Sequence, residues 1–153
     1  MLTIKSKKAQ DTFLLGKKIG EKICVPITIA LRGELGVGKT TFVQGLAKGL
    51  RVSAKYYITS PTFSLINEYP TKDFVFFHLD FYRLSGTRDL DDIGFDDIID
   101  KNHIIAIEWP EILDGLLEFD IQINFVFDKQ YNRIISLSAS GQSGVNLISK
   151  ISS

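Results

Sequence analysis

Residues 33–40 read Gly33-Glu34-Leu35-Gly36-Val37-Gly38-Lys39-Thr40 and fit the phosphate-loop pattern G-x-x-x-x-G-K-[ST] at every position. Glycines in such a loop let successive backbone N–H groups turn inward around a phosphate, where a Cβ atom would obstruct them. The helix that follows contributes its positive N-terminal end. The pattern therefore predicts a nucleotide-binding loop in which Lys39 reaches the β- and γ-phosphates and the Thr40 hydroxyl binds Mg²⁺.

The segments on either side of the loop have the patterns that this motif requires. Residues 27–31 form a short apolar run typical of a buried strand. After the loop, apolar residues recur at helical spacing between Val43 and Leu50. Upstream, residues 6–22 are predicted to form a helix with Ser6 as its N-cap.

The rest of the chain is predicted to add strands and short helices. The expected strands are residues 63–69 paired with 73–81, residues 103–109, and residues 119–127 paired with 133–139. Residues 86–100 are acidic and are expected to form short helices, whereas the tail from Ser143 is expected to be weakly helical at best. We therefore predict an α/β fold, P-loop NTPase-like and three-layered, with a mixed, partly parallel sheet.

The composition restricts the class of protein further. The chain has 153 residues with no internal repeat or linker, so we expect a single domain over residues 1–153. The 18 Lys and Arg residues balance the 18 Asp and Glu residues, which leaves no basic excess for holding nucleic acid by its phosphates. One cysteine, Cys24, excludes an internal disulfide. No apolar run spans a membrane and no signal peptide is recognisable, so we expect a cytoplasmic protein.

Two carboxylates follow apolar strands, as the phosphate loop itself does. Residues 75–77 lead to Asp80, and residues 104–107 lead to Glu108. Ligand crevices of α/β sheets lie at the carboxyl ends of strands, where a phosphate loop needs acidic groups to hold the metal and orient water. We therefore predict a Mg²⁺ site that uses both carboxylates, although each taken alone is also consistent with a solvated strand-end acid. His78 shares a face with Asp80 and is interpreted as a hydrogen-bond donor behind the metal ligands.

Two nearby residues keep more than one interpretation. Trp109 is either a core aromatic or a wall of the crevice, and Arg83 contacts either a phosphate, a partner or a surface carboxylate. A GTPase is not favoured, because residues 91–94 fit D-x-x-G without a buried strand before them and no N-K-x-D motif occurs.

Four motifs occur in order along the middle of the chain. They are Gly33 to Thr41, Ser60-Pro61-Thr62-Phe63, His78-Leu79-Asp80-Phe81-Tyr82-Arg83 and Ile107-Glu108-Trp109-Pro110. Together they resemble the TsaE (formerly YjeE) family of small bacterial P-loop ATPases, which are needed for threonylcarbamoyladenosine (t6A) modification of tRNA. The family usually has tyrosine where this chain has Phe63, a conservative departure.

The resemblance implies roles for individual residues. The phosphates would be cradled by Gly36, Val37, Gly38, Lys39, Thr40 and Thr41. Thr40 and Glu108 would hold Mg²⁺, and Asp80 would join the metal shell or position the attacking water. Residues 60–62 would act as a switch in which Thr62 senses the γ-phosphate, and Arg133 would lie near the nucleotide.

The resemblance also implies cofactors and partners. ATP and Mg²⁺ would be the cofactors, and the TsaB–TsaD heterodimer, which modifies the tRNA, would be the partner. Slow hydrolysis of ATP would reset that complex, so tRNA would be met only indirectly. A small-molecule kinase is the alternative, although kinases of this kind add an arginine-bearing lid and Arg133 is the only arginine after Arg88. A nucleotide-gated binding module without useful hydrolysis is a third possibility.

Overall fold

The computed structural model describes all residues, Met1–Ser153, and places every strand in one sheet. The strands are β1 (Leu2–Ser6), β2 (Ile27–Arg32), β3 (Ile66–Pro70), β4 (Val75–Asp80), β5 (Ile104–Glu108), β6 (Ile121–Phe127) and β7 (Arg133–Ala139). The helices are α1 (Ala9–Lys22), α2 (Lys39–Gly49), α3 (Arg88–Asp92), α4 (Phe95–Ile99) and α5 (Gln142–Ser152), and η1 (Pro110–Leu113) is a 3₁₀ turn.

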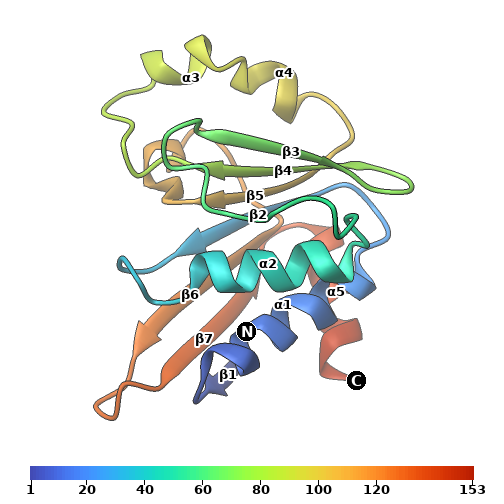
Figure 1. The fold of residues 1–153 in the computed structure, drawn as a ribbon, viewed down its shortest axis with the longest axis vertical. Helices are drawn as coiled ribbons and strands as arrows, with labels where there is room; N and C mark the ends of the chain where they lie inside the picture. Colours follow the sequence, from blue (N-terminus) through green and yellow to red (C-terminus); the bar gives the residue numbers. More distant parts are fainter.

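Parallel strands form the centre of the sheet, and antiparallel strands form its two edges. The seven strands lie in the order β1-β7-β6-β2-β5-β4-β3 (Figure 1). β2 pairs in parallel with β5 and β6, and β4 pairs in parallel with β5. The pairs β3–β4, β6–β7 and β1–β7 are antiparallel. The predicted α/β fold with a mixed, partly parallel sheet is therefore confirmed.

Helices cover both faces of this sheet, and this explains why its central strands are largely apolar. Every residue of β5 is buried, as expected for a parallel strand enclosed on both sides. One core cluster joins α1, α2 and α5 to the sheet through residues such as Ile19, Phe42 and Leu147. A second cluster packs α3, α4 and η1 against the other face, and α3 and α4 lie over β3–β5 in Figure 1. The arrangement has three layers.

The N-terminal residues form a strand that the sequence analysis did not predict. Leu2–Ser6 pairs with β7 in antiparallel register, with Ile4 opposite Ile135. The prediction that Ser6 caps a helix is wrong, because Ser6 ends β1 and α1 begins only at Ala9, after Lys8. The first turn is instead closed by Asp11, whose carboxylate accepts hydrogen bonds from the backbone N–H groups of Lys7 (3.0 Å) and Lys8 (3.2 Å).

The C-terminal tail is a complete helix, so the expectation of weak helicity is wrong. Residues Gln142–Ser152 form α5, which buries Leu147 and Ile151 in the first core cluster. Lys18 of α1 donates a hydrogen bond to the Ile151 carbonyl at 2.8 Å. Tertiary packing of an amphipathic face, rather than local propensity, therefore stabilises this helix.

Glycines let α1 and α2 touch backbone to backbone. A Cβ atom added at Gly45 of α2 would lie 1.9 Å from the Phe13 carbonyl oxygen, and one at Gly16 of α1 would lie 2.2 Å from that of Phe42. Gly20 and Gly49 repeat this close approach one turn further along. Since α2 follows the phosphate loop, this contact fixes the direction in which the start of α2 points.

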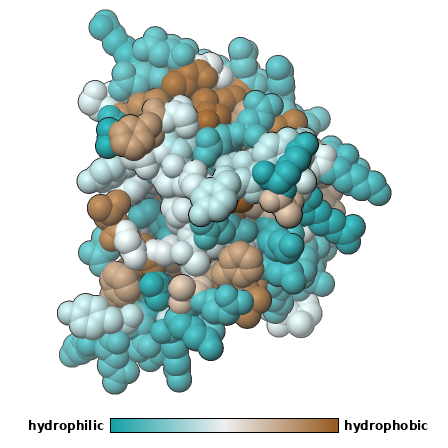
Figure 2. Space-filling view, in the orientation of Figure 1, coloured by the Kyte–Doolittle hydropathy of each residue, from teal (hydrophilic) through white to brown (hydrophobic).

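Hydrophilic residues cover most of the face seen in Figure 2, and apolar residues gather there in small separate areas. None of the helices combines the length and the apolar character that crossing a bilayer requires.

Candidate functional site

The phosphate loop connects the end of β2 to the start of α2, as the sequence predicts. Gly38 is the N-cap of α2 with a φ of 117°, and Gly36 has a φ of 78°. Both angles lie in the left-handed region that glycine adopts readily. A Cβ atom at Gly36 would meet no protein atom within 4 Å, because the backbone there borders an open cavity.

The cavity beside this loop has a volume of about 440 Å³ and lies at the carboxyl ends of β2, β4 and β5. Most residues predicted for the site line it, namely Gly36, Gly38, Lys39, Thr40, Thr41, Thr62, Asp80 and Glu108. These residues come from four separate parts of the chain, and the fold brings them together.

Lys39 lies inside the cavity rather than in solvent. Its side-chain ammonium donates hydrogen bonds to the carbonyls of Gly33 and Glu34, the latter at 3.0 Å, and lies 4.2 Å from the centre of the Trp109 ring. Burial lowers the pKa of Lys39, although the negative charges of Glu108 and Asp80 oppose this shift. The ammonium is thus held between the loop and the two acidic strand ends.

The two predicted carboxylates are neighbours on adjacent parallel strands. Asp80 of β4 stands opposite Glu108 of β5, and both side chains are buried. The Thr40 hydroxyl donates to Glu108 Oε1 at 2.9 Å. The Tyr82 N–H donates to Asp80 Oδ1 at 2.9 Å, which fixes the orientation of that carboxylate.

The ionisation of Glu108 is favoured by its surroundings. Burial alone would raise the pKa of this carboxyl, but the adjacent His78 ring and the hydrogen bond from Thr40 hold the pKa below its usual value. An ionised carboxylate is the form that binds a divalent cation.

Hydroxyl and carboxylate oxygens are the donor set that Mg²⁺ prefers, and the cavity supplies them from Thr40, Glu108 and Asp80. The fold holds no cluster of three or more His, Cys, Asp or Glu side chains suited to a metal. Mg²⁺ is usually held by one or two carboxylates together with substrate phosphates and water, and Asp80 and Glu108 supply two carboxylates here. The residues present therefore fit a Mg²⁺–nucleotide complex.

The segment 60–62 is tied to the carboxylates by its hydroxyls. Ser60 donates to Asp80 Oδ2 at 2.7 Å and lies 3.4 Å from Glu108 Oε2. The Thr62 hydroxyl lies 3.0 Å from that of Ser60 and 3.5 Å from Asp80 Oδ2. The sequence analysis placed Ser60 in the switch segment but did not predict its contact with Asp80, because a serine before a proline gives no sign of a contact with a strand 20 residues later.

Two predicted residues lie behind the loop rather than in the cavity. Val37 is fully buried in the first core cluster. Arg133, at the start of β7, donates from Nε to the Val37 carbonyl at 2.8 Å. Arg133 thus contacts the outside of the phosphate loop, and a direct contact with nucleotide stays a prediction.

The structure places the aromatic and basic neighbours of the site. Trp109 is a wall of the cavity, with its ring 4.8 Å from that of Tyr82. Arg83 forms no ion pair and its guanidinium lies 4.3 Å from the ring centre of Phe63, an exposed residue next to residues 60–62. A contact of Arg83 with a phosphate or a partner stays a prediction. Tyr82 lines the cavity as well, and the sequence analysis gave it no individual role.

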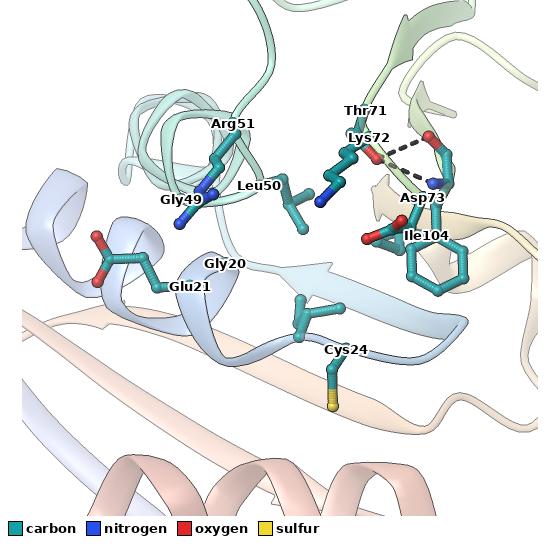
Figure 3. A pocket seen from close by; sticks show the side chains of 12 residues that line it. Gly20, Glu21, Cys24, Gly49, Leu50, Arg51, Thr71, Lys72, Asp73 and Ile104 are labelled. Carbon is teal, nitrogen blue, oxygen red and sulfur yellow. Dashed lines mark hydrogen bonds between the residues drawn. The ribbon is translucent and has the colours of Figure 1, made fainter.

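A second cavity, of about 340 Å³, lies at the other end of the strands, near the amino ends of β4 and β5 (Figure 3). Lys72 and Asp73 reach towards it from the β3–β4 turn, and Arg51 approaches from the end of α2. Its charges are of both signs, and it holds no group of residues that the sequence motifs contain. Most of the residues predicted for the site line the cavity beside the phosphate loop instead.

The similarity to known proteins extends over the same residues. A family model described as "Threonylcarbamoyl adenosine biosynthesis protein TsaE" matches residues 6–135. That span includes all four sequence motifs.

Curated proteins described as "tRNA threonylcarbamoyladenosine biosynthesis protein TsaE" are similar over most of their length. The protein of Treponema pallidum is 35% identical over 134 residues, covering 87% of this chain and 97% of its own. That of Borreliella burgdorferi is 34% identical over 128 residues, covering 83% and 90%. That of Aquifex aeolicus is 39% identical over 115 residues, covering 73% and 81%.

A solved structure shares the fold. The crystal structure of YdiB from Bacillus superposes with a TM-score of 0.78 at 25% sequence identity, covering 99% of this chain and 93% of that one.

Proposed function

The chain belongs to the TsaE family of threonylcarbamoyl adenosine biosynthesis proteins, and we propose that it is a Mg²⁺-dependent ATPase serving t6A modification of tRNA. One observation carries the proposal: Lys39, Thr40, Asp80 and Glu108 line a single cavity beside a glycine-rich loop. A structural loop has no need of two buried carboxylates facing a lysine, because burying charge is costly unless the charges have partners.

The proposed binding step uses the loop backbone and one helix terminus. N–H groups of residues 36–41 would bind the β- and γ-phosphates, and the Lys39 ammonium would neutralise their charge. Thr40 and Glu108 would hold Mg²⁺, which when bound neutralises charge on the phosphate oxygens. Asp80 would either complete the shell around the ion or position the attacking water.

In the proposed hydrolysis step, water attacks the γ-phosphorus and the bond from phosphorus to the β–γ bridging oxygen breaks, which gives ADP, inorganic phosphate and a proton released to solvent. Asp80 is held by Tyr82 and Ser60, so its carboxylate is suited to orienting that water. Lys39 would stabilise the negative charge that develops on the bridging oxygen of the leaving ADP. The absence of an N-K-x-D motif in the sequence supports ATP rather than GTP as the nucleotide.

The proposed partner is the TsaB–TsaD heterodimer, and the switch segment would couple it to the nucleotide. Ser60 and Thr62 contact Asp80 inside the cavity, whereas the next residue, Phe63, is 85% exposed. A partner that contacts Phe63 would therefore influence, and respond to, the groups around the γ-phosphate. The zero net charge supports a protein that meets tRNA only through this complex, in the cytoplasm.

The test is an ATPase assay of the full chain with and without its own TsaB–TsaD pair, in Mg²⁺ and in chelator. We expect slow hydrolysis alone, faster hydrolysis with the pair, and none in chelator. Equal rates with and without the pair would contradict the coupling. Transfer of phosphate to a nucleoside or small alcohol would favour the kinase alternative, and ATP binding without phosphate release under any condition would favour a binding module.

A further inference from the structure

His78 is completely buried, yet neither of its ring nitrogens has a hydrogen-bond partner. Most buried polar groups in proteins are paired, and an unpaired one destabilises the fold. An apolar side chain in the same place would avoid this cost. The imidazole at this position therefore needs an explanation other than packing.

The sheet places the ring directly below the two carboxylates of the cavity. Since side chains alternate along a strand, His78 and Asp80 point to the same face of β4. On β5 the residue opposite His78 is Ala106, and the next residue on that face is Glu108. The small side chain of Ala106 leaves room for the ring beneath the Glu108 carboxylate.

A carboxylate oxygen of Glu108 lies next to the ring. His78 Nε2 lies 3.6 Å from Glu108 Oε2, about 0.7 Å longer than an ordinary N–H···O hydrogen bond. The other oxygen of that carboxylate, Oε1, already accepts from Thr40. A small rotation of either side chain would close the distance, and Oε2, which otherwise has only the Ser60 hydroxyl at 3.4 Å, would gain a donor from inside the sheet.

We propose that His78 is a positioning residue that orients Glu108 for Mg²⁺ by presenting its Nε2–H to Oε2. The inference rests on the proposed function, since it concerns how the carboxylate is aimed at the ion. Groups behind metal ligands commonly fix ligand orientation in this way, and their loss costs about 10–100-fold in metal affinity. Thr40 holds Oε1 from the side of the phosphate loop, and His78 holds Oε2 from inside the sheet.

The test compares four variants of the full chain by calorimetry with a non-hydrolysable ATP analogue, with and without Mg²⁺. The readout is the affinity measured with Mg²⁺ divided by the affinity measured without it. This ratio does not depend on turnover. His78→Leu and His78→Asn should lower this ratio by about 10-fold, because leucine has no donor and asparagine is too short to reach Oε2. His78→Gln, whose amide reaches as far as Nε2, should keep the ratio within about 3-fold.

The matched control is His103→Leu. His103 is the other histidine of the chain and also has an unpaired Nδ1, but its ring packs on Phe77 with the centroids 4.7 Å apart and lies beside no carboxylate. The His103→Leu variant should leave the ratio of the two affinities unchanged.

A purely structural role for His78 predicts a different pattern. The Asn and Gln variants would then share the same ratio, whatever their thermal stability, and that result would overturn the inference. If the unsubstituted chain bound the analogue without any dependence on Mg²⁺, the proposed function itself would fail. Mg²⁺ dependence in the unsubstituted chain together with unchanged ratios in all His78 variants would remove only the role of His78.

Discussion

The Thr40 hydroxyl donates a 2.9 Å hydrogen bond to Glu108, two residues that lie 68 positions apart in the chain. The bond joins the first turn of α2 to the carboxyl end of β5. It brings together the two oxygen groups that we propose as Mg²⁺ ligands, one from the phosphate loop and one from the strand end.

Removing the Thr40 hydroxyl should weaken the site selectively. In Thr40→Val the shape of the side chain is retained but the oxygen is lost, so we expect ATP hydrolysis to fall by about 10²-fold. Thr40→Ser keeps the hydroxyl and should stay within about 5-fold of the parent. Steady-state phosphate release at saturating Mg²⁺ is the measurement, and equal losses in both variants would contradict the metal role.

Truncation of the loop lysine should abolish nucleotide binding. Lys39 is the cation nearest the proposed phosphate position and is held there by the carbonyls of Gly33 and Glu34. Lys39→Ala should show no heat of ATP binding in calorimetry with Mg²⁺. Lys48→Ala, an exposed lysine on the same helix, is the control and should bind ATP normally.

The two carboxylates should matter for chemistry more than for affinity. Asp80→Asn and Glu108→Gln should each cut the hydrolysis rate by about 10²-fold or more, because each removes a charge that acts in the transition state. ATP affinity should remain largely intact in both when it is measured without Mg²⁺. Asp73→Asn, at the far edge of the sheet, is the control. Parental rates in both site variants would remove these residues from the active site.

The stability of the fold should depend on pH through Glu108. Its pKa is lower in the folded chain than in the unfolded chain, so ionisation favours folding. This contribution is fully present above the unfolded pKa of about 4.3 and is lost as the pH falls through the lower folded value. Urea unfolding at a series of pH values from about 6 to 3 should therefore show a smaller loss of stability in Glu108→Gln than in the parent. Equal losses of stability in the parent and in Glu108→Gln would refute this.

The contact between α1 and α2 should not tolerate a methyl group. Gly45→Ala would place its Cβ against the Phe13 carbonyl, and a backbone atom cannot swing aside as a side chain can. We expect a loss of about 3 kcal/mol in the free energy of unfolding. In Gly86→Ala the added Cβ would meet no atom within 4 Å beyond its chain neighbours, so stability should change by less than about 0.5 kcal/mol. Chemical denaturation of both variants measures the difference.

The features that could be predicted from the sequence are those encoded by adjacent residues. The strand, loop and helix around Lys39 follow from local periodicity and a spaced motif, and Asp80 and Glu108 follow from their places after apolar strands. The structure brings these residues into one cavity, and their chemical roles stay predictions until they are measured.

The missed features depend on contacts between distant parts of the chain. β1 exists because Leu2–Ser6 finds an open edge on β7, about which its own five residues carry no information. α5 contains glycine and several serines, which favour other conformations, and only the burial of Leu147 and Ile151 offsets this. The bond from Ser60 to Asp80 was missed for the same reason.

The glycine contact between α1 and α2 has a mechanical consequence. At the glycine positions no side chain separates the two backbones, so the helices have little room to slide or roll past each other. A displacement of the first turn of α2 should therefore move α1 with it. Amide groups along both helices should then exchange with deuterium as one cooperative unit, slowly and in step. Tightening of the loop around a phosphate would thereby be transmitted to the surface of α1, on the far side of the helix that the loop begins.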